Sequence, residues 1–195
     1  MIGLLALAAA TAAFPAEITH PRSGDAAALV RLVNDYRADH GLPPVPVSRS
    51  LNAVAEAHVR DLMENRPDDG TGFGRGRCNM HSWSSAGPWK PVCYTRDHSR
   101  ASAMWSKPRE ITRGAYSGNG YEIAFWSGGE VTPEFALYGW QESRGHNDLL
   151  VEQGPWRGAD WQAMGVAIHG NYAVVWFGKE PDAGGRARMF AQRGR

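Results

Sequence analysis

The strongest constraint on the fold comes from two apolar runs near the C-terminus. Residues 163–169 read AMGVAIH and residues 172–177 read YAVVWF, with only Gly170 and Asn171 between them. Two β-rich runs joined by a two-residue turn that contains glycine are typical of a β-hairpin. A third run, YEIAFW at 121–126, is also rich in aromatic residues and reads as a strand. The sequence therefore predicts a small sheet in the C-terminal half.

Helical periodicity dominates the N-terminal half. From Ser23, apolar residues recur at the spacing i, i+3, i+4, i+7, at Leu29, Leu32, Val33 and Tyr36. Gly41 ends this helix, and the three prolines of LPPVPV exclude a helix over 42–47. A second helix is expected from Ser48 or Ser50 to about Asn65.

Two further helices are expected later in the chain. One is short, covers about residues 98–105 and is ended by Lys107-Pro108. The other begins at Thr132-Pro133-Glu134, where a capping residue precedes proline in the first turn. Helices first, then a strand, a helix and a hairpin indicate an α+β fold, with helices covering a small sheet.

The two ends differ in character from the middle. Residues 1–14 are uncharged and apolar and small residues follow, which predicts a signal peptide over 1–16, export to an extracellular or periplasmic location, and no integral membrane span after cleavage. Residues 17–182 are expected to form a single domain. Residues 183–195 contain four arginines and no acid, as in a disordered basic tail. The net charge of +1 offers no electrostatic reason to expect nucleic acid as a partner.

The chain has two cysteines, Cys78 and Cys93. An even pair in an exported protein favours one disulfide. Both lie in the irregular stretch 66–120, which is long for a loop and is therefore expected to be functional or covalently stapled.

Complete catalytic motifs are missing. The sequence contains no H-E-x-x-H, no G-x-S-x-G, no P-loop and no G-x-G-x-x-G. Whether the protein is an enzyme stays open at this point.

Four residues stand out as candidates for a site: His81 in MHSW, Glu122 in NGYEIA, Glu142 in GWQES and His146 in RGHNDLL. Glu142 and His146 share a face if the helix continues through Gly145. Glu122 is a charge in an apolar strand and needs a partner if it is buried. Two imidazoles and two carboxylates can bind a divalent metal such as zinc, or form a hydrogen-bond network. The alternative is that the glutamates face solvent and the histidines are unrelated.

His58 lies on the apolar face of the second predicted helix. It can be read as a ligand or as a hydrogen-bonded core histidine. We favour the second interpretation, because a polar side chain in a core is usually satisfied by local hydrogen bonds.

The chain resembles the CAP superfamily, which comprises the cysteine-rich secretory proteins, antigen 5 and pathogenesis-related 1 proteins with their bacterial relatives. The segments that carry the resemblance are LVNDYRADHGLPPVPVSRSLNAVAEAHVRDLM, MHSW, NGYEIAFW, WQESRGHNDLL and MGVAIHGNYAVVWFG, in the family's order over about residues 26–178. The resemblance implies an α-β-α sandwich with a small, mostly antiparallel sheet. It also implies a cleft lined by two His and two Glu, which correspond to His81, Glu122, Glu142 and His146. Some members bind divalent metal there, some bind sterols or fatty acids elsewhere, and protease activity has been proposed for a few.

Three functions follow as hypotheses. We favour a secreted, non-catalytic binding module with a metal-competent cleft and no required cofactor. A second hypothesis is a metal-assisted hydrolase, a protease or esterase, with Glu122 or Glu142 as general base. A third is a protein that binds lipid or sterol through an apolar groove built from some of the eight tryptophans. The partner is an unknown protein, lipid or sterol.

Overall fold

The computed structural model describes residues 23–69 and 77–187. The signal peptide expected over 1–16 lies outside the described residues. No helix among the described residues is long and apolar enough to cross a membrane.

Three antiparallel strands form the sheet: β1 (Gly120–Trp126), β2 (Ala163–His169) and β3 (Tyr172–Gly178), in the order β1-β3-β2. The predicted hairpin is confirmed as β2-β3. Its turn places Gly170 at a φ of 55°, a left-handed conformation that suits glycine. β1 crosses over to pair with β3 and lies at one edge of the sheet.

The two long helices match the prediction. They are α1 (Ser23–Asp39) and α2 (Arg49–Asn65). Ser48 is the N-cap of α2, and its hydroxyl accepts a hydrogen bond from the backbone nitrogen of Leu51. α2 packs directly on β2 because Gly165 has no side chain. A Cβ there would lie 2.1 Å from the carbonyl carbon of Leu51.

The shorter helices correct two expectations. They are α3 (Ala101–Trp105), α4 (Lys107–Ile111), α5 (Pro133–Gln141) and α6 (Arg144–Leu150), together with the 3-10 turns η1 (Pro67–Asp69) and η2 (Gly154–Trp156). Lys107-Pro108 was expected only to end a helix, but it also begins α4, because proline is well tolerated in the first helical turn. The helix predicted from residue 98 begins later, at Ala101.

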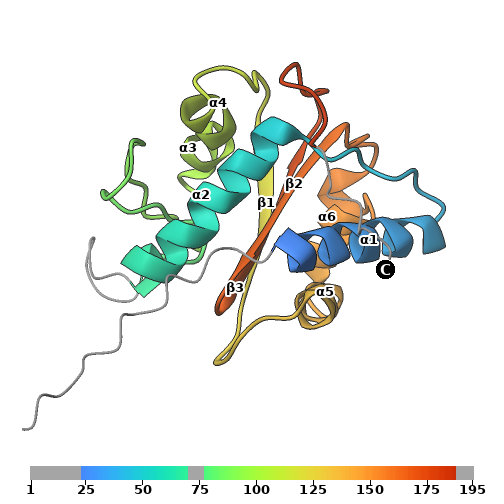
Figure 1. The fold of residues 1–195 in the computed structure, drawn as a ribbon, viewed down its shortest axis with the longest axis horizontal. Coiled ribbons are helices and arrows are strands. Elements are labelled where there is room, and N and C mark those ends of the chain that lie inside the picture. Colours follow the sequence, from blue (N-terminus) through green and yellow to red (C-terminus); the bar gives the residue numbers. More distant parts are fainter. Residues whose placement is uncertain (1–22, 70–76, 188–195) are drawn as a thin grey trace, which may run out of the picture.

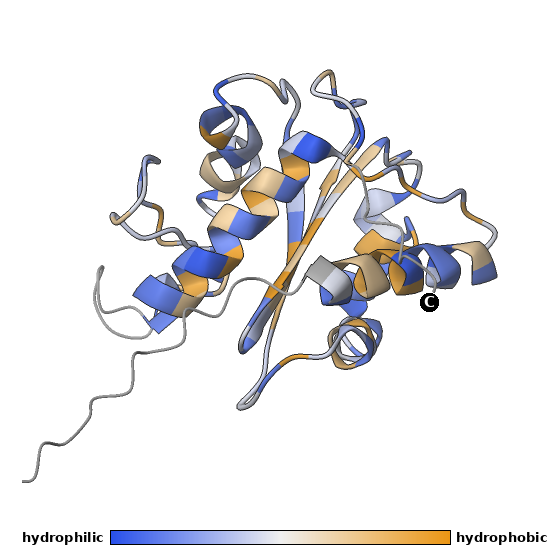
Figure 2. Ribbon diagram, viewed as in Figure 1, coloured by the Kyte–Doolittle hydropathy of each residue, from blue (hydrophilic) through white to orange (hydrophobic). Residues whose placement is uncertain are grey.

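The helices cover the sheet in two layers. α2, α3 and α4 lie on one face and α1, α5 and α6 on the other, with the sheet between them (Figure 1). Side chains alternate between the faces along each strand. On β3, Ala173, Val175 and Phe177 belong to the α1-side core, whereas Tyr172, Val174 and Trp176 belong to the α2-side core. Figure 2 shows hydrophobic residues along β2 and β3, and mixed hydrophobic and hydrophilic residues on the long helices. This is the α+β sandwich that the sequence predicted.

One disulfide and two backbone hydrogen bonds fix the remaining parts of the described chain. Cys78 and Cys93 form the expected disulfide. The segment expected to be a disordered tail begins as ordered chain: the carbonyl of Gly185 accepts from the nitrogen of Arg49, and the nitrogen of Ala187 donates to the carbonyl of Val47. Backbone hydrogen bonding to the rest of the chain therefore continues as far as Ala187. Residues 188–195 lie outside the described residues.

Candidate functional site

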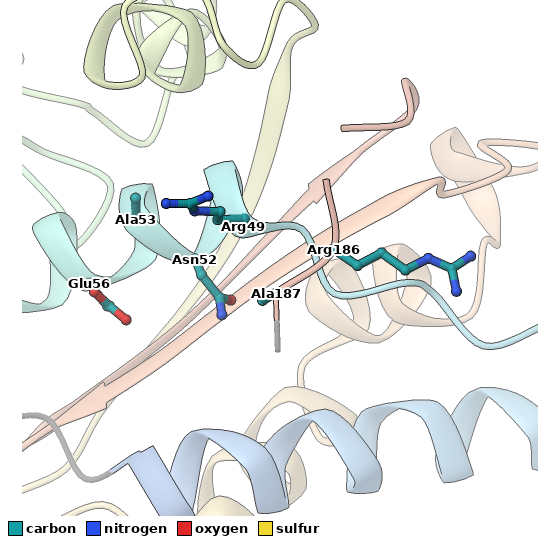
Figure 3. Close-up of a pocket in the computed structure, with 6 residues that line it drawn as sticks. All are labelled: Arg49, Asn52, Ala53, Glu56, Arg186 and Ala187. Atoms are coloured by element: carbon teal, nitrogen blue, oxygen red, sulfur yellow. The ribbon is translucent and has the colours of Figure 1, made fainter. Parts of the chain in front are cut away.

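Two pockets of similar volume compete as sites. One, of about 490 Å³, lies beside the start of α2. Figure 3 shows that the guanidinium groups of Arg49 and Arg186, two of its lining residues, point away from each other. The other pocket, of about 510 Å³, lies at β1 and includes His81, Glu122 and His146. The second pocket is therefore the candidate site, because three predicted residues converge there.

The walls of this pocket come from both helical layers. One wall belongs to the long segment before β1 and to α3, and the other to α6 and η2. The apolar part of the lining consists mainly of large side chains: Met104, Trp105, Tyr121, Ile123, Leu149 and Trp156. The ring of Tyr121 lies 5.7 Å from that of Trp105 and 5.1 Å from that of Trp156, between centroids. An apolar pocket with a few convergent polar groups is the usual form of a ligand site.

Glu122 lies at the centre of the polar part. Its side chain is fully buried, and each carboxylate oxygen has one imidazole partner. Oε1 lies 2.5 Å from Nδ1 of His58, and Oε2 lies 2.8 Å from Nδ1 of His81. Burial alone raises the pKa of Glu122, but the charge and hydrogen bonds of the two histidines outweigh it and lower the pKa. The expectation that a buried Glu122 needs a partner is confirmed.

His58 is the residue whose role the sequence missed. It is fully buried in α2, and its Nε2 lies 2.9 Å from the carbonyl oxygen of Ser82. Its ring stacks on that of Trp83 at 4.1 Å between centroids, with 8° between the planes. The interpretation as a hydrogen-bonded core histidine is confirmed, but one of its partners is the site carboxylate. A charged Glu122 in an apolar strand and a histidine on the apolar face of a helix each need a polar partner in the core. Considered together, these two sequence features indicate that Glu122 and His58 meet.

His81 connects the buried pair to the pocket. Its backbone nitrogen donates to the side chain of Asn79, and its ring packs edge-on against Tyr94. Its side chain is 17% exposed, in contrast to the fully buried side chains of His58 and Glu122. Because Nδ1 is occupied by Glu122, Nε2 is the nitrogen left for a ligand.

His146 reaches the same pocket from α6. Its pKa is lowered to about 4, mainly by burial; the nearby His81 contributes to the lowering and the charge of Glu122 opposes it. The imidazole is therefore neutral at physiological pH, which is the form that binds metals.

Glu142 is not among the residues that line the pocket. It is exposed and lies between α5 and α6, because Ser143 takes an extended conformation (φ −102°, ψ 106°) and starts a new helix. The condition for an i, i+4 pair of Glu142 and His146, one helix that runs through both residues, is therefore not met. Within residues 23–69 and 77–187, no group of three or more His, Cys, Asp or Glu side chains is arranged to hold a metal ion. The structure brings together three of the four predicted residues, plus His58.

Comparison with known families agrees with this architecture. Residues 30–176 match the model of CAP, the cysteine-rich secretory protein family. The match covers most of the chain, so this protein belongs to that family. No curated protein matches the chain.

Three bacterial proteins are among the solved structures that are similar to this chain. An extracellular protein containing an SCP domain from Bacillus anthracis aligns with a TM-score of 0.53 and 18% identity, over 80% of this chain and 41% of that one. A cysteine-rich secretory protein from Staphylococcus aureus aligns with a TM-score of 0.49 and 14% identity, over 80% of this chain and 39% of that one. An outer surface protein from Borrelia burgdorferi aligns with a TM-score of 0.49 and 18% identity, over 80% of this chain and 93% of that one. The chain thus spans about two fifths of the length of the first two proteins.

Proposed function

We propose that this protein is a secreted binding module whose ligand pocket lies at β1, and that His81 and His146 make the pocket competent to hold a divalent metal. The observation that carries this proposal is that two imidazoles, those of His81 and His146, line one large and mostly apolar pocket. Secretion is supported by the apolar N-terminal sequence, by the disulfide and by the description of the Bacillus anthracis protein as extracellular.

The donor set supports a metal held by imidazoles rather than by carboxylates. Metal-binding histidines usually donate their second N–H to a carboxylate, and Nδ1 of His81 meets Glu122 in this way. Glu122 was predicted as a ligand, but both of its oxygens already meet histidines. We therefore propose that Glu122 orients His81 and that His81 and His146 are the two protein ligands. When bound, the metal would supply a Lewis-acidic centre for a ligand in the pocket.

The hydrolase hypothesis receives less support. A general base needs a free oxygen and a pKa near the working pH. The pKa of Glu122 lies below its ordinary value and both oxygens are engaged, while Glu142 is exposed outside the pocket. The geometry favours binding over general-base catalysis.

Calorimetric titration with zinc at neutral pH tests the proposal. We expect saturable binding at one site, and loss of binding in both His81→Ala and His146→Ala. His40→Ala is the matched control, since His40 lies on α1 and its Nδ1 contacts the carbonyl of Tyr36. Binding that survives both pocket variants would overturn the proposal, as would the absence of any binding.

A further inference from the structure

β1 pairs with one neighbouring strand, and its second edge is open. It lies at the end of the strand order β1-β3-β2, and within residues 23–69 and 77–187 no further strand or isolated bridge pairs with that edge. An open strand edge presents main-chain N–H and C=O groups with which another chain can pair. The pocket includes residues of β1, so this edge is the part of the sheet nearest to a ligand.

The hydrogen-bond ladder shows which residues point to the open edge. Just beyond β1, Ser127 donates its N–H to the carbonyl of Asn171 at 3.1 Å, in the same register as β1 and β3. Residues of an antiparallel strand alternate between those that exchange hydrogen bonds with the neighbour and those that do not. In steps of two from Ser127, the N–H and C=O of Ile123 point to β3. Those of Glu122 therefore point to the open edge.

The main chain of Glu122 is accessible from the pocket. Glu122 is 5% exposed as a residue, whereas its side chain is 0% exposed, so the exposed atoms belong to its main chain. Glu122 also lines the pocket, whose walls come from both helical layers. One N–H donor and one C=O acceptor of a strand thus face a cavity of about 510 Å³.

An extended peptide matches this combination better than a lipid does. A hydrocarbon tail fills an apolar cavity, but it leaves the N–H and C=O of Glu122 without partners in a site that it closes to water, which is unfavourable. Among the described residues that line the pocket, none is a lysine or arginine that could hold an anionic headgroup. A residue of an extended chain satisfies both main-chain groups at once, as paired residues in antiparallel sheets do.

We propose that the pocket binds an extended segment of another polypeptide, which adds to β1 as an antiparallel strand and exchanges two main-chain hydrogen bonds with Glu122. The segment would be the ligand of the same pocket, so this assignment rests on the proposed function. The antiparallel direction follows that of the existing sheet.

The alternation of side chains along a strand predicts which peptides bind. The peptide residue opposite Glu122 places its side chain on the α2 side, beside His81, because opposite residues of a sheet share a face. Its two neighbours place theirs on the α1 side, where Ile123 and Leu149 provide apolar surface. The preferred ligand therefore carries two large apolar side chains at positions i and i+2.

Selection from a peptide library tests this spacing. Wild-type protein, freed of metal by a chelator at neutral pH, is immobilised and exposed to phage that display random seven-residue peptides. We expect enrichment of large apolar residues at i and i+2, whereas a groove for helices would enrich i, i+3 and i+4. No enrichment, or enrichment at helical spacing, would overturn the proposal. Calorimetric binding of palmitate without selection of the i, i+2 pattern would instead make the pocket a lipid site.

Main-chain pairing is tested with the tightest selected peptide, synthesised with acetyl and amide caps. N-methylation of the residue between the two apolar ones removes the N–H donated to the carbonyl of Glu122, so affinity should fall about 10-fold in calorimetry. N-methylation of either apolar residue is the matched control, because its N–H points away from β1, and affinity should change far less. Equal losses at adjacent positions would contradict strand addition.

Hydrogen exchange of the wild-type protein locates the contact without any variant. The amide of Glu122 should exchange more slowly when the peptide is bound. The amide of Ile123 should be slow with and without the peptide, because it is paired with β3. Unchanged exchange at Glu122 in the presence of saturating peptide would place the peptide elsewhere and overturn the proposal.

A variant of the pocket wall adds a test of the apolar contact. Trp156→Ala should weaken peptide binding about 10-fold, as truncation of a central aromatic contact does. Tyr138→Ala is the control, since Tyr138 is an exposed aromatic residue of α5 that does not line the pocket. Equal affinities of the two variants would contradict binding in this pocket.

The outcomes separate this inference from the metal site. If the wild-type protein binds zinc but selects no i, i+2 peptides, the metal-competent pocket stands and strand addition is overturned. If it selects such peptides, and they slow exchange at Glu122, but it binds no zinc, the peptide assignment stands and the metal is removed from the proposed function.

Discussion

The two faces of the sheet bury different kinds of side chain. Toward α1, the buried strand residues are all apolar, among them Ile123, Val175 and Phe177. Toward α2, the strands bury aromatic residues, alanines and Val174 together with Glu122, whose carboxylate contacts His58 of α2. Glu122 and Ile123 are neighbours in β1 and face opposite layers. The same strand thus contributes to a fully apolar core and to a buried polar network.

The two faces of the sheet therefore contribute differently to stability and to the candidate site. An apolar face specifies strand register strongly, since a slip of one residue would place Glu122 in the α1-side core. A buried ionic pair contributes little net stability, because desolvation offsets most of the attraction. We infer that the α1-side core holds the fold together and that the polar network on the α2 side serves the pocket, which α6 completes from the other layer. The disulfide stabilises the loop that carries His81.

The largest expected effect comes from breaking the polar pair. Glu122→Leu should lower the free energy of unfolding by about 3–5 kcal/mol, because the buried His58 loses its partner. Urea denaturation measures this loss. The double variant with His58→Leu should recover most of it, since apolar residues often replace a buried ion pair without cost. A double variant as unstable as the single one would show that the network itself stabilises the fold.

Removal of the disulfide should come next in magnitude. The bond links positions 15 residues apart, so the variant Cys78→Ala/Cys93→Ala should lose about 3 kcal/mol, mainly through greater freedom of the unfolded chain. Thermal denaturation with and without a reducing agent measures it. The reductant should destabilise the wild-type protein by the same amount and leave the variant unaffected. An unchanged midpoint in the variant would mean that packing alone orders the loop.

Titration of His146 should make stability depend on pH. The pKa of His146 is about 4 in the folded protein against 6.5 for an ordinary histidine. Between these values the unfolded chain binds more protons, so stability falls as the pH drops from 6.5 toward 4 and this loss is complete below 4. Partial solvent access reduces the expected loss to about 2 kcal/mol.

Denaturation across this pH range, with a chelator present, measures the contribution of His146. His146→Gln should flatten the profile between pH 4 and 6.5 relative to the wild-type protein. A profile that keeps its slope in the variant would assign the pH dependence to another group.

The smallest expected effect lies on the apolar face. Ile168→Val should cost about 1 kcal/mol through the loss of one buried methylene, with the same value at every pH, because Ile168 belongs to the α1-side core and does not line the pocket. Denaturation at two pH values measures it, and zinc titration serves as the second readout. A fall in zinc affinity as large as that of His81→Ala would contradict the separation of the two faces.

Local sequence patterns determined most of the fold. The hairpin around Gly170-Asn171, the Ser48 cap and the Thr132 cap depend on residues near one another in the chain, and all are present. The break between Gln141 and Arg144 was harder to see, because Ser143 and Gly145 only weaken a helix in sequence and do not specify where it turns.

The site itself was determined only in part. The sequence indicated that Glu122 needs a partner if it is buried, and the family resemblance implied that His81 and His146 line one cleft. Only the tertiary structure decided that His58, 64 residues earlier in the chain, is that partner and that Glu142 stays outside. The physical reason is that helix and strand patterns follow from neighbours along the chain. Which buried acid meets which imidazole depends instead on how α2 is placed against β1.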